Sequence, residues 1–75
     1  MNKIRRKDIG RAIALLDQAR EILETVRDDE EAAFENMPES IQRSERGEAM
    51  EDYISALDDM ISNLDTDSLQ EIVDG

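Results

Sequence analysis

The sequence contains no cysteine and no histidine, and these absences limit how so short a chain can be stabilised. A domain of 75 residues buries only a modest share of its surface, so proteins of this size often depend on disulfides, a metal ion or association. Disulfides and the usual zinc sites are excluded here. Association with another chain, or very regular helix packing, therefore remains. The lack of cysteine also fits a cytoplasmic protein.

The same absences argue against an enzyme. Cysteine and histidine nucleophiles and bases are missing, and no serine lies in the setting of a nucleophile elbow. Carboxylate pairs such as Asp28-Asp29 and Asp58-Asp59 are expected on solvated faces of a chain with 20 acidic residues, so they carry little specificity. We therefore expect no catalytic residue, no cofactor and no metal ligand.

Long apolar runs are also missing. No segment approaches the roughly 18 consecutive apolar residues of a membrane span. The basic N-terminus is not followed by an apolar stretch of signal-peptide type, because Asp17, Gln18, Arg20 and Glu21 intervene. We expect a cytoplasmic protein that has no membrane partner.

Aromatic residues make up 3% of the chain, whereas alanine, leucine, glutamate and arginine are common, which favours helix over strand. The stretch from Asn36 to Gly47 holds the single proline and interrupts two long helical patterns. We predict one all-α domain over residues 1–75. It is an antiparallel helical hairpin of residues 8–36 and 44–64 with a short C-terminal helix at 68–73. Residues 1–7 are predicted to be a basic arm that is either a frayed end or the ragged first turn of the first helix.

Apolar residues recur at steps of three and four in both long segments, as on one face of a helix. The predicted packing faces are Ile9, Ala12, Leu16, Ala19, Leu23 and Val26, then Met50, Tyr53, Leu57, Met60 and Leu64. Glu30 falls at a core position of the first pattern. The stripe is wider than one partner helix covers, which indicates a dimeric, four-helix-like bundle. Its predicted oligomer core is Ile13, Leu16, Leu23, Val26, Leu57 and Met60.

Local signals place the helix ends. Asp8 is the predicted N-cap of the first helix, and Ser44 that of the second. Pro38 ends the first helix and can open a short helical turn. Asp67 and Gln70 resemble a capping box.

A calcium loop is an alternative use of the segment that follows the second helix. Oxygen ligands at Asn63, Asp65, Asp67 and Asp74 have the right spacing. Ser68 stands where such a loop needs glycine, and Asp74 stands where it needs glutamate. We interpret the segment as a helix cap.

Charge is the most distinctive property of the sequence. The formal net charge is −11, with five basic residues against one acidic in residues 1–11 (+4) and four against nineteen in residues 12–75 (−15). Carboxylates on the first long helix recur at steps of four and three, at Asp17, Glu21, Glu24, Asp28, Glu31 and Glu35. Such a line is either a solvated face that keeps the bundle soluble or a decoy that occupies a basic nucleic-acid-binding groove.

The turn carries more polar residues than a minimal turn needs: Glu39, Gln42, Arg43 and Arg46. The two arginines either brace the loop against Glu35 or Glu39, or the group forms a second partner-binding surface.

At this turn the sequence resembles a known family. Phe34 to Gln42 (FENMPESIQ) and Ser44 to Glu48 (SERGE), followed by acidic heptads, are similar to small uncharacterised helical proteins of phages and mobile elements of Gram-positive bacteria. The resemblance covers roughly residues 9–64. The family has no assigned activity, so it implies an origin and no site residue.

We therefore expect a non-enzymatic phage or mobile-element protein in the host cytoplasm. It would bind and inhibit a host nucleic-acid-binding or defence protein with a basic surface, for example as a DNA mimic, without binding nucleic acid itself. The alternative is a structural or assembly module that binds a partner helix through its apolar stripe. A regulatory protein that binds DNA through residues 3–7 is a third hypothesis.

Overall fold

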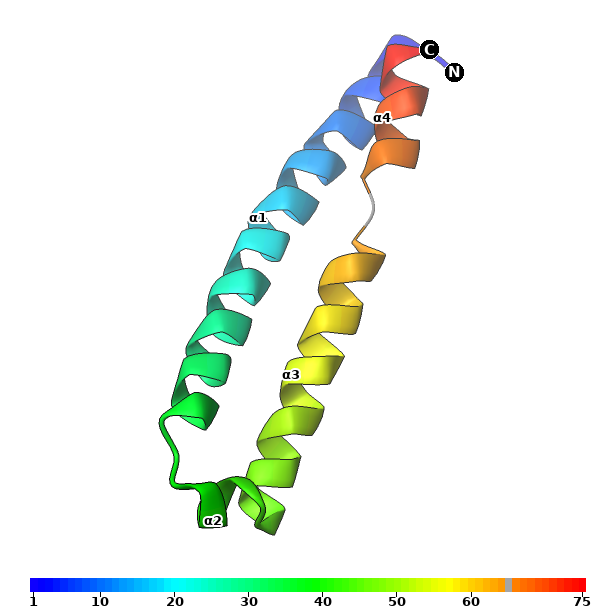
Figure 1. Ribbon diagram of the computed structural model, residues 1–75. Helices are drawn as coiled ribbons and strands as arrows, with labels where there is room; N and C mark the ends of the chain where they lie inside the picture. The colour runs from blue at the N-terminus through cyan, green and yellow to red at the C-terminus, as the bar shows by residue number, and fades with distance from the viewer. Residues whose placement is uncertain (65) are drawn as a thin grey trace.

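The structure is a computed structural model that describes residues 1–64 and 66–75. These residues form α1 (Lys3–Glu35), α2 (Glu39–Gln42), α3 (Glu45–Asn63) and α4 (Asp67–Asp74), without a strand among them. α3 and α4 run back along α1, so the chain makes a helical hairpin with both termini at one end (Figure 1). The prediction of an all-α chain is confirmed.

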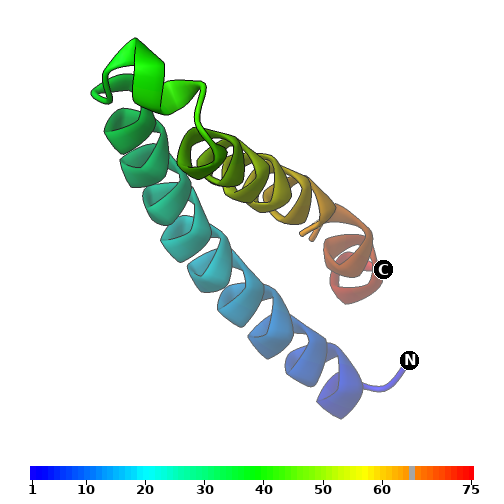
Figure 2. The ribbon, with the colours of Figure 1, turned by 90° about the horizontal axis from the view of Figure 1, so that it is seen from below.

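The hairpin is only two helices wide and is strongly elongated (Figure 2). Its Cα atoms extend over 58 × 14 × 13 Å, and their radius of gyration is 17.5 Å. A compact domain of this length would have a radius of about 11 Å. Because there is no third layer, α1 can bury side chains only along the line where it contacts α3 and α4. We call this line the seam.

α1 begins earlier than the sequence predicts. Asn2 is its N-cap, and the Asn2 side chain accepts a hydrogen bond from the backbone N–H of Arg5 at 2.8 Å. Residues 3–7 are therefore the first turns of α1, which is one of the two expectations for this segment, and the prediction of an Asp8 cap is wrong. Asn2 offers a capping oxygen before the first turn, so the helix has no need to wait for Asp8. Asp8 instead lies within α1, with its carboxylate 3.8 Å from Arg11.

The turn forms as its local signals predict. α1 ends at Glu35, Pro38 precedes the short helix α2, and Ser44 is the N-cap of α3. The Ser44 hydroxyl donates to the carbonyl of Ile41 and accepts from the backbone N–H of Gly47 at 3.5 Å. The proline and serine predictions are confirmed because both act on their immediate neighbours.

The start of α4 differs from its prediction. Thr66 is the N-cap and makes no side-chain capping bond, while Asp67 is already the first helical residue. The capping-box prediction is wrong, since Gln70 donates to Asp74 at 3.0 Å instead of reaching back toward the cap. Asp65, a member of the predicted cap and of the candidate calcium loop, lies outside the described residues.

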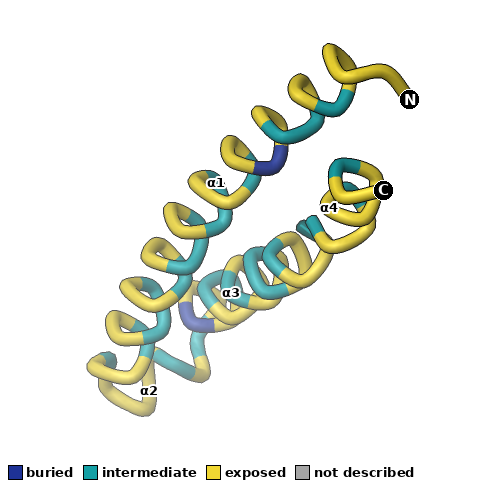
Figure 3. Tube along the Cα trace, turned by 90° about the horizontal axis from the view of Figure 1, so that it is seen from above, coloured by how far each residue is buried: buried dark blue, intermediate teal, exposed yellow. Residues whose placement is uncertain are grey.

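The seam keeps Ile9, Leu16 and Leu23 of the predicted stripe of α1 but is rotated away from Ala12 and Val26. Ile13 is the buried apolar residue of the described chain (Figure 3). The other seam residues of α1 are half-buried: Ile9, Leu16, Arg20, Leu23, Arg27, Glu30 and Phe34. Those of α3 are Met50, Ile54, Leu57, Ile61 and Leu64, beside the buried Gly47.

Several predicted packing positions are therefore corrected. Ala12 is exposed, Val26 and Met60 are 47% and 53% exposed, and Tyr53 is 61% exposed. Two apolar stripes lie next to each other on α1, about one residue apart around the helix. The observed seam buries Ile13 and half-buries Phe34 in place of the smaller Ala12 and Val26 of the predicted stripe. Glu30 is half-buried at the seam, as predicted.

A pair of glycine substitutions tests the packing of α2 on α3. A Cβ on Gly47 would lie 2.1 Å from the backbone oxygen of Gln42, whereas a Cβ on Gly10 meets no atom within 4 Å. We expect Gly47→Ala to lower the free energy of unfolding by about 1–3 kcal/mol through overpacking. Gly10→Ala, within α1, is expected to raise it by about 0.5–1 kcal/mol. Urea unfolding followed by circular dichroism measures both, and equal stability of the two variants would contradict this packing.

Candidate functional site

The predicted line of carboxylates forms one continuous surface on α1. We call it the acidic face: Asp17, Glu21, Glu24, Asp28, Glu31 and Glu35. Neighbours three or four residues apart on a helix lie about 5–6 Å from each other. Each residue advances the helix by about 100°, which places this line about a quarter turn from the seam. It therefore occupies one broad side of the two-helix hairpin.

α3 adds carboxylates to the same broad side. Glu51 and Asp58 follow the seam of α3 by about a quarter turn, and Glu48 lies somewhat further out. The acids of α1 and α3 are rotated from the seam in the same sense when each helix is viewed from its own N-terminus. In two parallel helices such rotations would place them on opposite sides of the seam, but α1 and α3 are antiparallel. Here they bring both sets of carboxylates to one side. The structure thus joins acids of both helices into one surface, which the sequence presented as separate outer faces.

The opposite broad side carries exposed apolar side chains by the same geometry. We call it the apolar face: Leu15, Ile22 and Val26 of α1, Tyr53 and Met60 of α3, and Ile72 of α4. Their exposed fractions range from 40% at Ile72 to 65% at Ile22. On α1 this stripe lies about half a turn from the acidic face. Acidic and apolar side chains are therefore segregated onto the two sides of the hairpin.

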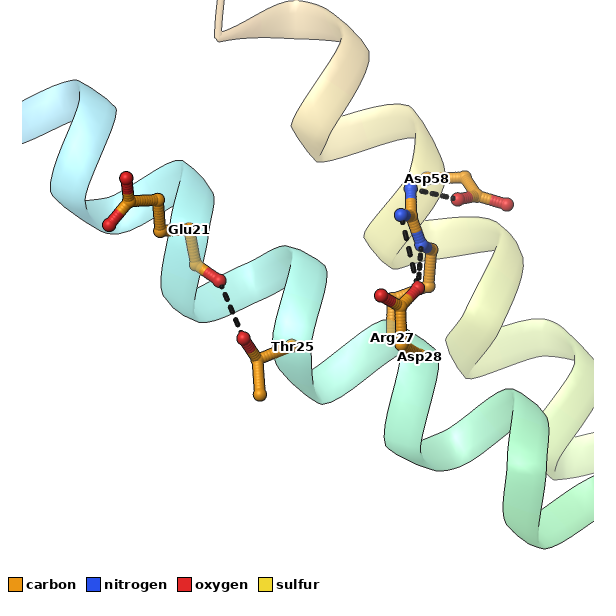
Figure 4. A network of polar contacts seen from close by, with 5 residues as sticks. All are labelled: Glu21, Thr25, Arg27, Asp28 and Asp58. Atoms are coloured by element: carbon orange, nitrogen blue, oxygen red, sulfur yellow. Dashed lines mark hydrogen bonds and ion pairs between the residues drawn. The ribbon is translucent and has the colours of Figure 1, made fainter.

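One ion-pair network ties the acidic side to the seam (Figure 4). The Arg27 guanidinium donates to Asp58 of α3 at 3.0 Å and to the neighbouring Asp28 at 3.2 Å. The Arg27 side chain is 25% exposed, so this contact is partly shielded from water. Hydrogen bonds to Asp58, and then to Asp28, raise the pKa of Arg27 above its ordinary value. Sequence reasoning missed Asp58 as a partner, because the pairing depends on how α1 and α3 are aligned.

The remaining members of the acidic face are available for a partner. Within the described part of the chain, only Asp28 of the six takes part in an ion pair. Thr25 donates to the backbone carbonyl of Glu21 at 3.0 Å, so this contact leaves the Glu21 carboxylate unused (Figure 4). Asp17, Glu21 and Glu35 are exposed, whereas Glu24 and Glu31 are half-buried beside the seam.

The predicted turn residues divide into two groups. Gln42 donates to the carbonyls of Phe34 at 2.9 Å and Met37 at 3.1 Å, which satisfies acceptors at the end of α1. Arg43 forms an ion pair with Glu39, as the bracing interpretation predicts for one of the two arginines. These three side chains therefore hold the turn together. Arg46 is exposed.

The residues of the predicted oligomer core also fall into two groups, one in the seam and one on the apolar face. Ile13 is buried in the seam, and Leu16, Leu23 and Leu57 are half-buried along it, so these four serve packing within the hairpin. Val26 and Met60 are exposed and lie on the apolar face. The exposed residues Leu15, Ile22 and Tyr53 join them there. The signal for this grouping is the second heptad-like stripe of α1, one position away from the seam.

A shallow hollow of about 350 Å³ lies on α1 and is lined by Glu21, Ile22, Thr25 and Val26. It brings no set of polar groups together. Over residues 1–64 and 66–75, no three acidic residues converge as metal ligands would. No helical segment in these ranges has the length and sustained apolarity of a membrane span.

Comparison of the chain with models of protein families, with curated proteins and with solved structures gives no match. The assignment of a function therefore depends on the surfaces themselves.

The Arg27 network yields a stability prediction. We expect Arg27→Ala to lower the thermal unfolding midpoint more than Arg43→Ala, because Arg27 links α1 to α3 across the seam and its side chain is only 25% exposed. The Arg43–Glu39 pair joins residues of one short segment and is largely exposed, so its loss should cost about 0.5 kcal/mol or less. Melting followed by circular dichroism compares the two variants. A larger effect of Arg43→Ala would show that the seam does not depend on Arg27.

Proposed function

We propose that the chain is a non-enzymatic binding protein of a phage or mobile element that acts in the host cytoplasm. In this proposal the acidic face binds the basic groove of a host nucleic-acid-binding or defence protein and excludes the nucleic acid, as a DNA mimic does. The acting form is a homodimer with a four-helix-like core. It needs no cofactor and contacts neither nucleic acid nor membrane.

The density of charge on the acidic side is the observation that carries the proposal. The acidic face together with Glu51 and Asp58 supplies eight carboxylates on one side of the hairpin. They are spread over about 27 Å of helix at 1.5 Å per residue, or one charge per about 3.4 Å. A single strand of duplex DNA carries one phosphate per about 3.4 Å. A groove adapted to phosphates thus meets a comparable linear charge density.

The segregation of the carboxylates favours binding over solubility alone. Solubility is served by charges distributed over the whole surface. Here one broad side is acidic and the other is apolar, while Arg27 is the basic residue that the acidic face engages. A field of one sign on one side attracts a basic partner and accelerates its association.

The resemblance at the turn supports the origin in a phage or mobile element. Small acidic proteins of such elements often inhibit host machinery that handles DNA, which is an association of context and not of mechanism. This association is consistent with the negative net charge of the chain.

An apolar-face function is the second candidate, and the exposure of Tyr53 and Met60 favours it. A structural or assembly module would bind a partner helix there. Met60→Lys distinguishes the two candidates, because it alters the apolar face and leaves every carboxylate of the acidic side in place. Leu57 is unsuitable for this purpose, since it is half-buried in the seam.

The acidic-face proposal is tested by charge reversal at its three exposed positions that have no ion pair. The immobilised chain is incubated with the heparin-retained proteins of a Gram-positive host lysate, and captured proteins are identified by mass spectrometry. We expect duplex DNA to release them. The triple variant Asp17→Lys, Glu21→Lys, Glu35→Lys should lose about tenfold or more in affinity because like charges then face the groove.

The matched control reverses three exposed carboxylates elsewhere: Asp52→Lys, Asp59→Lys and Glu71→Lys. These lie on the outward sides of α3 and α4, and the change in net charge is the same. The control should retain its partner. If both variants lose the same affinity for the partner, net charge alone explains the binding. If the acidic-face variant keeps its full affinity, the decoy proposal is refuted.

A further inference from the structure

We propose that a second copy of this chain covers the apolar face, stacked on it end for end so that the two α1 helices cross near Ile22. The inference specifies the surface and geometry of the dimer in the proposed function. It does not depend on what the acidic face binds.

The exposed area of the hairpin is the first argument. Its accessible surface is 5747 Å². A folded monomeric protein of its mass, 8.6 kDa, exposes about 4,700 Å². The excess of about 1,000 Å² is close to the roughly 800 Å² that each partner buries in a stable interface of standard size. One further copy of the chain is therefore enough to cover it.

The sequence of the apolar stripe on α1 is the second argument. It follows heptad-like steps at Ala12, Leu15, Ala19, Ile22, Val26 and Ala33, and the exposed Asp29 takes the step between the last two. Large and small side chains alternate along it, which allows a facing helix to approach closely and interdigitate. Ile13 is the buried apolar residue of the described chain, so the hairpin alone buries little and gains from a second layer.

Charge sets the direction of stacking. Residues 28–52, at the turn end, hold ten acidic residues against two basic ones, a net charge of −8. At the other end, residues 1–11 carry +4 and residues 66–75 carry −3, so this end is nearly neutral. Stacking the hairpins in the same direction would place two turn ends of −8 together. Stacking them end for end places each turn end beside the basic first turns of the other copy, which is the favourable arrangement.

The two-fold axis of this arrangement passes between the two α1 helices. The stripe runs from Ala12 to Ala33, so its midpoint lies at Ile22. Ile22 then faces Ile22 of the second copy, and Arg5 lies opposite Glu39 of that copy. Both acidic faces point away from the interface, which leaves each of them open to a partner.

The absence of native cysteine permits a direct test of the axis. A single Ile22→Cys variant of the full chain should form a disulfide-linked dimer under mild oxidation, because a disulfide requires Cα atoms within about 7 Å. Glu21→Cys is the matched control, since Glu21 is exposed at the same level of α1 as Ile22 and lies on the acidic face. Linkage of Ile22→Cys at least about tenfold faster than the control supports the proposal. Equal rates for the two variants overturn it.

Sedimentation equilibrium tests the face independently. The chain should be a dimer at micromolar concentration. The double variant Val26→Glu, Met60→Glu should raise the dimer dissociation constant by about 100-fold or more, which is roughly 2.7 kcal/mol. Ala14→Glu, Ser55→Glu adds the same charge at exposed positions off the apolar face and should leave the constant unchanged.

A wild-type monomer at these concentrations, or a dimer that both double variants preserve, overturns the proposal. Far-ultraviolet circular dichroism of the double variants separates dissociation from unfolding. The cross-linking result for Ile22→Cys does not depend on which of the two occurs. Neither measurement contains a host protein. Failure of the dimer is therefore distinguishable from failure of acidic-face binding.

Discussion

The arrangement of every surface on this protein depends on which stripe of α1 packs against α3 and α4. α1 carries two apolar stripes about one residue apart, and only one of them can face the returning helices. Burial of Ile13 together with Leu16, Leu23 and Phe34 fixes the choice, because these side chains remove more apolar area from water than a stripe that includes Ala12 and Ala33 would. Once that seam is set, the acidic face lies on one side and the unused stripe on the other.

The seam itself is thin and partly polar. It includes Arg27, which meets Asp58 at 3.0 Å, and the half-buried Glu30. A two-helix layer with so few buried side chains has little hydrophobic stabilisation, while a row of like charges on one side opposes it. Covering the apolar face would add the missing layer without disturbing the carboxylates. Stability and binding are thus assigned to opposite sides of the same hairpin.

The features that the sequence predicted well are those decided by neighbouring residues. Pro38 cannot continue a helix, and Ser44 caps the helix that it precedes, so the turn follows from local chemistry. Two residues, Asn2 and Asp8, are able to cap the first helix. The sequence pattern predicts Asp8, whereas the structure uses Asn2. The Gln42 contacts with Phe34 and Met37 were not predictable from the sequence, since they require the turn to be folded back on α1.

The sequence by itself determined the helical class, the position of the turn and the acidic line from Asp17 to Glu35. Each follows from the helical period or from a residue's effect on its own backbone. Only the tertiary structure decided that Val26, Tyr53 and Met60 are exposed, that Arg27 pairs with Asp58, and that acidic and apolar sides are opposed. A helical period fixes which residues share a face, but the direction of that face is set by the element that packs against it.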